Sequence, residues 1–449
     1  MEHESVSFED LGTRAAEILR GNDAGGWTKA APNLYPHQWS WDSAFISIGW
    51  AHLNIERAAA ELRSLFRAQW RTGKIPHIVF NPAVPQSDYF PGSEFWACAR
   101  LSPDVPEGTE SSGLLQPPVH AIAAWRIWEI AKRQGGASEE PAFAFLQEAY
   151  PPLLAWHRHL VTARDPEESG LIATFHPWEG LDNSPRWDKA LSRIEVGDLA
   201  PYTRADLKHV HDPTQRPTMD EYDRYLWLVE LMKQVNYDDA AIYADYPYLV
   251  KDVFMTGILV AANDALDKIA ELVGAPDDDH QTIREWIELG MRGLESSWDE
   301  EWGLCLDYDV RADEQIRTKS IAGFAPLIAG RGKPERIARQ LDVFDSLAFC
   351  GHPQLRWPLP PSTSPDDPAF NPRRYWRGPN WPFLNWFFWW ALERAGQPNR
   401  AAELRKASLH QVTAAEFAEY IEPFTGEPLG SSDQSWTASM VLDWLAAND

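Results

Sequence analysis

Cysteine is scarce in this sequence: Cys98, Cys305 and Cys350 are the three in 449 residues, far apart and without a CxxC pair. Thiols so few and so widely spaced form neither a disulfide framework nor a zinc site, which indicates a reducing compartment. The first ten residues, MEHESVSFED, are acidic and lack the apolar segment that a secretory signal needs. We therefore expect buried free thiols and a cytoplasmic location.

Positive charge is scarce as well. The chain has 41 lysine and arginine residues against 66 aspartate and glutamate residues, a formal charge of −25, and no basic stripe interrupts it. Such a surface repels polyphosphates and anionic bilayers, so we expect neither nucleic acid nor a membrane as a partner. The longest aromatic and apolar run, residues 381–392, is too short to span a bilayer and contains Asn385.

Common nucleotide-binding and hydrolase motifs are missing too. The sequence has no GxGxxG after a strand pattern, no GxxxxGK[ST], no HExxH and no GxSxG. Dinucleotide-binding, phosphate-loop, zinc-protease and serine-hydrolase interpretations therefore have no support. We expect no cofactor and no metal.

Tryptophan, in contrast, is abundant: 23 residues, accompanied by 13 tyrosines and 19 phenylalanines. Flat aromatic faces commonly hold the C–H faces of sugars or flat apolar ligands. We nevertheless expect most of the tryptophans in the core, because this residue is highly buried on average. The 44% hydrophobic and 24% charged content is typical of a globular protein with a sizeable core.

Helical periodicity dominates the chain. Apolar residues recur at intervals of three and four in ten stretches: 55–70, 117–134, 141–162, 220–235, 247–273, 279–297, 334–346, 379–396, 399–412 and 434–446. Alternating strand patterns are confined to 171–176 and 303–310, which we interpret as short, isolated hairpins. No repeat of fixed period is visible, which argues against a regular solenoid and favours a closed helical array. We predict an all-α fold in a single domain, 1–449.

Long loops rich in proline, glycine, tryptophan and aspartate separate these helices. They span 21–42, 74–116, 163–218 and 351–381. Loops of this length are usually functional or disordered, and the aromatic content argues against disorder. We expect them to be ordered and to build a site, with 74–116 and 163–218 as insertions that shape it.

Carboxylates beside aromatic rings are the candidates for chemistry in these loops. Asp42 follows Trp41 and could cap a helix or contact a ligand. Asp182 lies in WEGLDNSPRWD together with Glu179 and Asp188, and it could form an Asx-turn or act in catalysis.

Two further loops carry candidate residues. Arg216 precedes a helix and could hold a substrate carboxylate or pair with a local acid. Tyr375, Trp376 and Trp381 surround a Gly-Pro turn and could form a sugar platform or a rigid anchor.

The segment FAEYIEPFTGEPLG (417–430) contains three glutamates. Glu419 lies among aromatic neighbours that would limit its solvation, whereas Glu422 and Glu427 precede prolines and look turn-like, so Glu419 is the better catalytic candidate. Two carboxylates in an aromatic cleft suggest glycoside hydrolysis, in which one acid protonates the leaving oxygen and the other attacks or activates water.

Several blocks together resemble a known family: LYPHQWSWDSAFISIG (34–49), WEGLDNSPRWD (178–188), QRPTMDEYDRYLW (215–227), YWRGPNWP (375–382) and FAEYIEPFTGEPLG (417–430). They are similar to blocks of the bacterial mannosylglycerate and glucosylglycerate hydrolases of glycoside hydrolase family 63, and the resemblance extends from about residue 10 to the C-terminus. It implies an (α/α)6 barrel, a six-hairpin toroid, with long inserted loops and minor β-hairpins.

The resemblance also implies a reaction and a set of site residues. Asp182 matches the general acid, and Glu419 the general base, of an inverting α-glycosidase that hydrolyses glucosylglycerate and/or mannosylglycerate to hexose and glycerate. The residues that match sugar contacts are Tyr35, Trp39, Trp41, Asp42, Gln116, Trp178, Gly180, Trp376 and Trp381. The residues that match glycerate contacts are His77, Tyr89, Arg216, Tyr222, Tyr375 and Gln434.

These roles set physical requirements. Asp182 must stay protonated near neutral pH, so we expect its pKa to be raised by desolvation against Trp178 or Trp187 and by a nearby acid. Glu419 must stay ionised, and inversion places the two carboxyl groups about 6.5 to 9.5 Å apart, with water between them. Because the protein is strongly acidic, local donors such as Arg216 must override its overall field to bind glycerate.

Other interpretations of the sequence stay open. Another α-glucosidase or a trehalase-like hydrolase could use the same barrel, because a fold does not dictate its substrate. A non-catalytic carbohydrate-binding protein is the alternative from a different class. The expected partner is a small-molecule glycoside, and the sequence leaves a homo-oligomer open.

Overall fold

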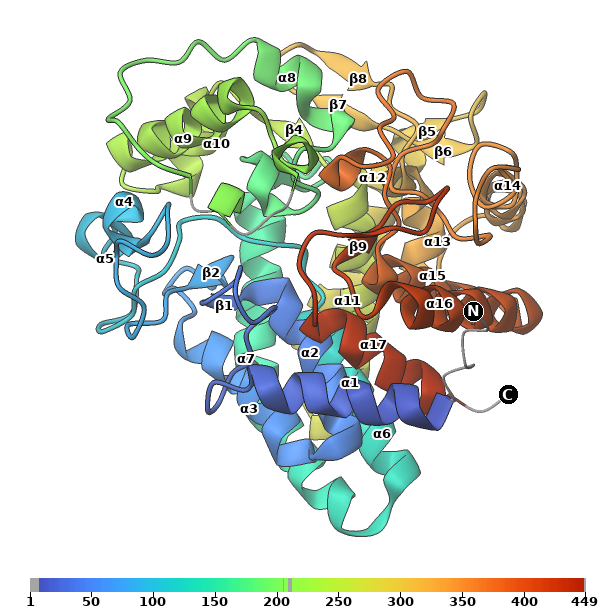
Figure 1. Cartoon of the computed structure of the whole chain (residues 1–449). Coiled ribbons are helices and arrows are strands. Elements are labelled where there is room, and N and C mark those ends of the chain that lie inside the picture. Colours follow the sequence, from blue (N-terminus) through green and yellow to red (C-terminus); the bar gives the residue numbers. More distant parts are fainter. Residues whose placement is uncertain (1–7, 205, 209–211, 448–449) are drawn as a thin grey trace.

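The structure, a computed structural model, describes residues 8–204, 206–208 and 212–447 (Figure 1). The contacts between helices arrange the body of the protein as two concentric rings. Each of six inner helices contacts the next around the ring, and the last contacts the first. The inner helices are α2 (Ser40–Leu53), α6 (His120–Gln134), α11 (Val253–Val273), α13 (Ala325–Ala329), α15 (Pro382–Arg394) and α17 (Ser435–Ala446). The closed ring confirms the predicted all-α barrel.

Each helix of the outer ring packs against the inner helix next to it along the chain. The outer helices are α1 (Phe8–Asn22), α3 (Ile55–Arg67), α7 (Glu139–Ala163), α12 (Asp277–Ser296), α14 (Pro334–Phe344) and α16 (Pro398–Ala415). Helices α1 and α17 come from opposite ends of the chain and lie side by side, so the barrel closes where its first and last helices meet (Figure 1).

Burial distinguishes the inner from the outer helices. In α2 every residue from 40 to 51 is buried, so this helix has no polar stripe to turn toward solvent. Helix α3 instead has a single buried face with the three- and four-residue spacing of an amphipathic helix. The α2 segment is missing from the periodic stretches, because a helix that is buried all round shows no periodicity, and only the possible cap at Asp42 pointed to a helix there.

Local sequence fixes where several helices begin and end. Proline occupies the first turn of α13, α14, α15 and α16, where its missing N–H costs no hydrogen bond. Asp252 caps α11 by accepting hydrogen bonds from the backbone N–H groups of Phe254 and Met255. The predicted helix 247–273 is therefore wrong at its start, because residues 250 and 251 form a strand before this cap.

A buried carboxylate on α17 joins four of the inner helices. Asp443 is 0% exposed and accepts hydrogen bonds from Arg126 of α6 and from the indole N–H of Trp386 of α15, at 2.8 Å. His52 of α2 lies 2.9 Å from the same carboxylate. Although burial opposes ionisation, Arg126, His52 and Trp386 hold the pKa of Asp443 well below its ordinary value.

The strands are short and lie outside the helical rings. They are β1 (Gln38–Trp39), β2 (Ile78–Val79), β3 (Ala173–Thr174), β4 (Val250–Lys251), β5 (Trp298–Asp299), β6 (Leu304–Cys305), β7 (Asp307–Asp309), β8 (Glu314–Ile316), β9 (Tyr420–Ile421) and β10 (Pro428–Leu429). β1–β2, β5–β6 and β9–β10 are antiparallel pairs. β3, β4, β7 and β8 form one antiparallel sheet, so the prediction that 171–176 and 303–310 are isolated hairpins is wrong.

Five further helices lie between the barrel helices: α4 (Ser93–Trp96), α5 (Cys98–Leu101), α8 (Asp188–Ser192), α9 (Met219–Gln234) and α10 (Asp239–Asp245). Short 3-10 helices add Gly136–Ser138, Pro177–Glu179, Pro185–Trp187, Asp206–Lys208, Pro213–Gln215, Ile321–Phe324 and Tyr375–Arg377. Those within 74–116 and 163–218 give these long loops the local order that the sequence predicts.

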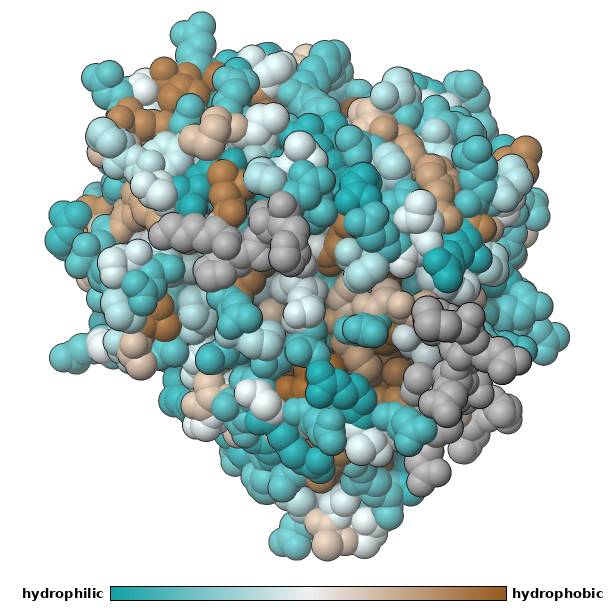
Figure 2. All heavy atoms as spheres, viewed as in Figure 1, coloured by the Kyte–Doolittle hydropathy of each residue, from teal (hydrophilic) through white to brown (hydrophobic). Residues whose placement is uncertain are grey.

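The surface is mainly hydrophilic on the face shown in Figure 2, and hydrophobic residues appear there in small, separate groups. The exposed large hydrophobic residues of the described chain are Val196, Met219 and Leu347. Within the same residues, no helix combines the length and the apolar character that crossing a bilayer requires. All three cysteines are buried and free, as predicted.

Candidate active site

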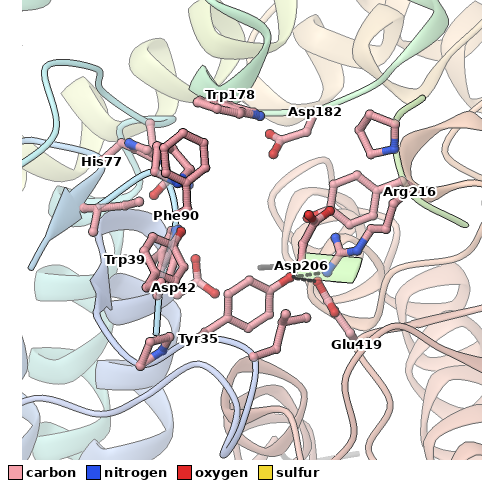
Figure 3. A pocket seen from close by; sticks show the side chains of 18 of the residues that line it. Tyr35, Trp39, Asp42, His77, Phe90, Trp178, Asp182, Asp206, Arg216 and Glu419 are labelled. Atoms are coloured by element: carbon pink, nitrogen blue, oxygen red, sulfur yellow. Dashed lines mark hydrogen bonds between the residues drawn. The ribbon is translucent and has the colours of Figure 1, made fainter. Parts of the chain in front are cut away.

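The predicted loops meet around one cavity (Figure 3). Its volume is about 140 Å³. Its lining comes from all four long loops and from the segments that carry Tyr222, Glu419 and Trp436. The lining residues are Asn33, Leu34, Tyr35, Pro36, Trp39, Trp41, Asp42, His77, Ile78, Asp88, Tyr89, Phe90, Pro91, Trp96, Gln116, Trp178, Gly180, Asp182, Asp206, Arg216, Pro217, Tyr222, Tyr375, Trp376, Glu419 and Trp436.

Asp182 and Glu419 both face this cavity. In Figure 3 Asp182 enters beside Trp178 at the top of the view, and Glu419 enters from below, next to Tyr35 and Arg216. The two residues are 237 positions apart in sequence (419 minus 182), and the fold brings them to the same hollow. Sequence reasoning thus selected two acids that the structure places together.

Asp182 lies in a turn that follows the 3-10 helix Pro177–Glu179. The backbone N–H of Asp182 donates a hydrogen bond to the carbonyl of Gly180 at 3.0 Å. The carboxylate of Asp182 accepts no hydrogen bond from any other residue that the structure describes. The Asx-turn alternative is therefore wrong. Desolvation raises the pKa of Asp182 well above its ordinary value; Arg216 opposes this shift and the negative charge of Glu419 adds to it.

Glu179 anchors the chain just before Asp182. Its carboxylate is bound by both terminal nitrogens of Arg164 at 2.7 Å and accepts hydrogen bonds from the backbone N–H groups of Leu115 and Phe175. The hydroxyl of Thr174 donates to it as well. This fully bonded, buried carboxylate has a structural role, which leaves Asp182 as the acid of the motif that faces the cavity.

Glu419 is 1% exposed and lies just before β9. The hydroxyl of Tyr35 donates to its Oε1 at 2.6 Å, and the backbone N–H of Ser431 donates to its Oε2 at 2.9 Å. Donors on both oxygens fix the orientation of this buried carboxylate. Glu422 and Glu427 have other partners: Glu422 accepts hydrogen bonds within its own turn, and Glu427 pairs with Arg373 at the surface, as the turn interpretation predicts.

Asp42 is a third acid of the cavity and is 6% exposed. It lies in the first turn of α2, whose cap position is Trp39, so the capping alternative is wrong and the side chain faces the cavity. Burial raises the pKa of Asp42 well above its ordinary value, and the nearby Glu419 and Asp182 reinforce the shift. Three acids therefore surround one hollow, and burial raises the pKa of two of them, Asp42 and Asp182.

Arg216 provides positive charge in this acidic site. It is 5% exposed, donates from Nη2 to the hydroxyl of Tyr35 at 3.3 Å and lies 4.7 Å from the ring centre of Tyr375. It forms no ion pair with any described residue, so the alternative that it pairs with a local acid is wrong. Its Nε has no hydrogen-bond partner in the described structure, which leaves a donor free for an anionic ligand.

Aromatic rings form much of the cavity wall. Tyr35 and Tyr89 each meet Trp39 edge to face, with ring centres 5.0 and 5.9 Å apart. On another side Trp376 lines the cavity and stacks on Trp381 at 3.8 Å with 2° between the planes. Such rigid rings suit the C–H faces of a sugar ring.

Polar groups between the rings are held in defined states. His77 is within 2.7 Å of the Ser112 hydroxyl through Nδ1, and burial lowers its pKa to about 3, so the imidazole is neutral near pH 7. The Oε1 atom of Gln116 accepts a hydrogen bond from the backbone N–H of Trp41 at 3.1 Å, which orients its amide.

The fold brings together all of the residues proposed for the site except two. Trp381 is 0% exposed and stands behind Trp376, outside the lining. Gln434 caps α17 through a hydrogen bond from the N–H of Ser435 and also lies outside the lining. Trp381 therefore supports the lining residue Trp376 from behind, whereas Gln434 has a capping role at the start of α17.

Several lining residues were missed, among them Asp88, Phe90, Trp96, Asp206 and Trp436. Asp206 is the most polar omission, and Arg204 binds both of its oxygens at 3.0 and 2.7 Å. An arginine two residues before an aspartate, as Arg204 is before Asp206, is only a weak sequence signal for such an ion pair. Among the residues that the structure describes, no group of three or more histidine, cysteine, aspartate or glutamate side chains could hold a metal ion.

Known proteins share both this sequence and this fold. The family described as "Mannosylglycerate hydrolase MGH1-like glycoside hydrolase domain" matches residues 35–437. The chain is 48% identical over 442 residues to the glucosylglycerate hydrolase of Mycolicibacterium hassiacum, covering 98% of this chain and 99% of that protein. It is 40% identical over 437 residues to the mannosylglycerate hydrolase of Thermus thermophilus, covering 96% and 99%.

A solved structure agrees over nearly the same length. The family 63 mannosylglycerate hydrolase from Thermus thermophilus, in complex with Tris and D-glycerate, matches with a TM-score of 0.88 at 39% identity, covering 97% of this chain and all of that chain. Such similarity covers barrel and loops alike. The chain therefore belongs to the MGH1-like family of glycoside hydrolases, within glycoside hydrolase family 63.

Proposed function

We propose that this enzyme hydrolyses the α-glycosidic bond of glucosylglycerate, mannosylglycerate or both, and releases hexose and glycerate with inversion at the anomeric carbon. Asp182 is the general acid and Glu419 the general base. The observation that carries this proposal is that both acids line one cavity with opposite hydrogen-bond environments: Glu419 has two donors, and Asp182 has none from other described residues. Family membership supports the reaction class.

The reaction needs one proton delivered and one removed. Asp182 gives its proton to the glycosidic oxygen, so that glycerate leaves as an alcohol. Water forms the new bond to the anomeric carbon from the opposite face, and Glu419 takes the proton that this water loses. After turnover Asp182 is a carboxylate and Glu419 a carboxylic acid, and exchange with solvent restores both.

The charge of the cavity suits this leaving group. Glycerate carries a carboxylate, and the described cavity lining contains one arginine, Arg216, with an unpaired buried donor. A guanidinium presents a planar fork that matches a carboxylate with two parallel hydrogen bonds. D-glycerate in the related Thermus structure agrees with a family preference for this acid.

The direct test measures hexose released from each glycosylglycerate by the purified protein. We expect turnover of at least one compound, and proton NMR of the first-formed hexose should show the β-anomer from the α-linked substrate. Asp182→Asn and Glu419→Gln keep side-chain size and should each lower kcat by about 10²- to 10⁴-fold with an unchanged unfolding midpoint. The proposal would be overturned if the wild-type protein released hexose from neither compound.

Arg216 separates this function from a trehalase-like activity. Arg216→Met should raise KM for the glycosylglycerates and leave KM for trehalose or maltose nearly unchanged, because those substrates have no carboxylate. Equal effects on both substrate classes would show that Arg216 has a structural role and does not bind glycerate. Sugar binding without hydrolysis, measured by calorimetry over long incubation, would instead support the non-catalytic alternative.

A further inference from the structure

Three separate segments line the cavity next to the proposed catalytic acid. We call them the acid loop (residues 180–184, with Asp182), the arginine segment (residues 215–218, with Arg216) and the aromatic turn (residues 374–377, with Tyr375 and Trp376). They are far apart in sequence, and each contributes lining groups. Their mutual arrangement therefore decides whether acid, anion-binding and ring groups act on one substrate at once.

One carboxylate, that of Glu221 in the first turn of α9, contacts all three segments. From the acid loop, Asn183 donates from Nδ2 to its Oε1 at 3.1 Å. From the arginine segment, the backbone N–H of Thr218 donates to its Oε2 at 2.7 Å, which completes a capping box. From the aromatic turn, Arg374 bonds to Oε2, and Nη2 of Arg377 lies 3.7 Å from Oε1.

Two of the tied segments contain a residue in the left-handed backbone region, and one of these residues needs support from its surroundings. Asn183 has φ +60° and Tyr375 has φ +32°, both in the left-handed region. Asparagine accepts this region readily, but a bulky residue such as Tyr375 does so only where surrounding contacts impose it. Tyr375 is flanked by the two arginines that face Glu221, so these ion pairs hold the strained residue on both sides.

The same cluster reaches the far end of the acid motif. Arg377 also pairs with Asp188, six residues after Asp182. Glu221 itself does not line the cavity, and its side chain is 19% exposed. It can therefore influence the reaction only through the segments that it holds, and its replacement does not leave an isolated charge in the core.

We propose that Glu221 is a positioning residue, whose carboxylate fixes the acid loop, the arginine segment and the aromatic turn relative to one another. Without this carboxylate, the three segments lose the hydrogen bonds and the ion pair that tie them to one group. This inference rests on the function proposed above, because it assumes that Asp182 and Arg216 act on one substrate. Misplacement by about 1 Å in a catalytic site can cost about 100-fold in rate.

The central variant is Glu221→Gln, and the chain offers a matched control in Asp220→Asn. Asp220 is the neighbouring acid in the same helical turn; it pairs with Arg224 and its side chain is 78% exposed, with no contact to the three segments. Both variants remove one negative charge from the start of α9. We expect Glu221→Gln to lower kcat/KM by between about 10- and 100-fold, and Asp220→Asn to change it less than about twofold.

A second control separates positioning from helix capping. Thr218→Ala removes the hydroxyl that accepts a hydrogen bond from the N–H of Glu221 and donates one to its Oε2, but it leaves the contacts of Glu221 to the backbone N–H of Thr218, to Asn183 and to Arg374 in place. We expect this variant to lower the unfolding midpoint slightly and to retain most of kcat. If Thr218→Ala reproduced the full loss of Glu221→Gln, capping alone would explain the effect and the proposal would fail.

The pH profile supplies a readout that a general loss of stability does not move. If Glu221→Gln loosens the acid loop, Asp182 gains hydration, its pKa falls, and the basic limb of kcat/KM moves to lower pH. The groups that act electrostatically on Asp182 include Asp42, Tyr89, Arg216, Tyr225, Tyr375 and Glu419. Loss of the negative charge of Glu221 also lowers the pKa of Asp182, so Asp220→Asn, which removes a charge from the same helical turn, serves as the control for this electrostatic part, and the shift in Glu221→Gln should exceed it.

Hydrogen exchange tests the anchor without reference to activity. In the full-length protein, Glu221→Gln should speed amide exchange in peptides that cover 180–187 and 371–378, and Asp220→Asn should not. Unchanged exchange in both peptides, or kinetics equal to those of Asp220→Asn, would overturn the positioning role. Wild-type turnover of the glycosylglycerates is measured in parallel, so that failure of the proposed function is seen separately from failure of the anchor.

Discussion

The hydroxyl group of Tyr35 donates a hydrogen bond of 2.6 Å to Oε1 of Glu419 and accepts one of 3.3 Å from Nη2 of Arg216. One phenol thus joins the proposed base to the cation proposed to bind glycerate. Because both ends of this short chain are buried, the orientation of the base depends on a residue nearly four hundred positions earlier in the sequence.

Replacing Tyr35 by phenylalanine should therefore affect the rate more than binding. The variant loses a hydrogen bond to a charged group, worth about 1.5–3 kcal/mol, so we expect kcat to fall by about 10- to 100-fold. Tyr150→Phe, which removes a hydroxyl that bonds Asp279 on the outer ring, is the control and should leave kcat unchanged. Steady-state kinetics of both variants test this expectation. A kcat of Tyr35→Phe equal to that of Tyr150→Phe would contradict a role for Tyr35 in orienting the base.

The pH dependence of hydrolysis should reflect the raised pKa of Asp182. Since the general acid must be protonated, kcat/KM should fall as pH rises through that pKa. The positive charge of Arg216 lowers the pKa of Asp182, so its removal in Arg216→Met should raise the pKa and move the basic limb to higher pH. Profiles of the residual activity between pH 5 and 9 test this direction, and a limb displaced to lower pH would contradict it.

Trp381 should act on the sugar through Trp376. Trp381→Ala removes the ring stacked behind Trp376, so we expect a loss of about 3–5 kcal/mol in the free energy of unfolding together with a raised KM. Trp156→Ala on the outer helix α7 deletes another fully buried indole and should cost similar stability without a change in KM. Denaturant unfolding and kinetics are measured on both, and a KM unchanged in Trp381→Ala would show that Trp376 needs no support.

Asp443 should make the stability of the barrel depend on pH. Asp443→Asn breaks a buried ion pair and should lower the free energy of unfolding by about 3–5 kcal/mol at neutral pH. The folded-state pKa of Asp443 is depressed, so its contribution is complete above the unfolded value of about 3.9 and is lost as pH falls toward the folded value. Unfolding midpoints of the two proteins should therefore converge in acid, and a difference independent of pH would contradict this account.

Periodic sequence patterns predicted most of the helices, and their limits are physical. The outer helix α3 has one apolar face and is readily recognised, whereas α2 is buried all round and carries no such signal. Strand β4 was absorbed into the helix prediction for 247–273, since Val250 continues the apolar spacing and only the cap at Asp252 marks the boundary. Local patterns cannot foresee that β4 pairs with strands far away in the sequence.

For the site, too, the sequence predicted some features, and others depend on contacts between distant segments. The resemblance selected Asp182, Glu419 and Arg216, and the fold places all three at one cavity. Asp206 escaped notice because its place in the cavity depends on contacts between segments that are distant in sequence, which no short motif encodes. Trp381 shows the converse: its sequence neighbourhood suggests a platform, but only the structure reveals that Trp376 stands in front of it.

The meeting of α1, α2 and α17 has a consequence for how the polypeptide acquires its shape during synthesis. A ring whose final helix contacts its first two cannot be completed until nearly the whole chain has left the ribosome. Until then α2, which is buried on every side in the finished barrel, lacks one of its neighbours, and contacts this distant in sequence form slowly. Nascent chains that stop before α17 should therefore stay open to proteases and bind chaperones, whereas the finished chain escapes both.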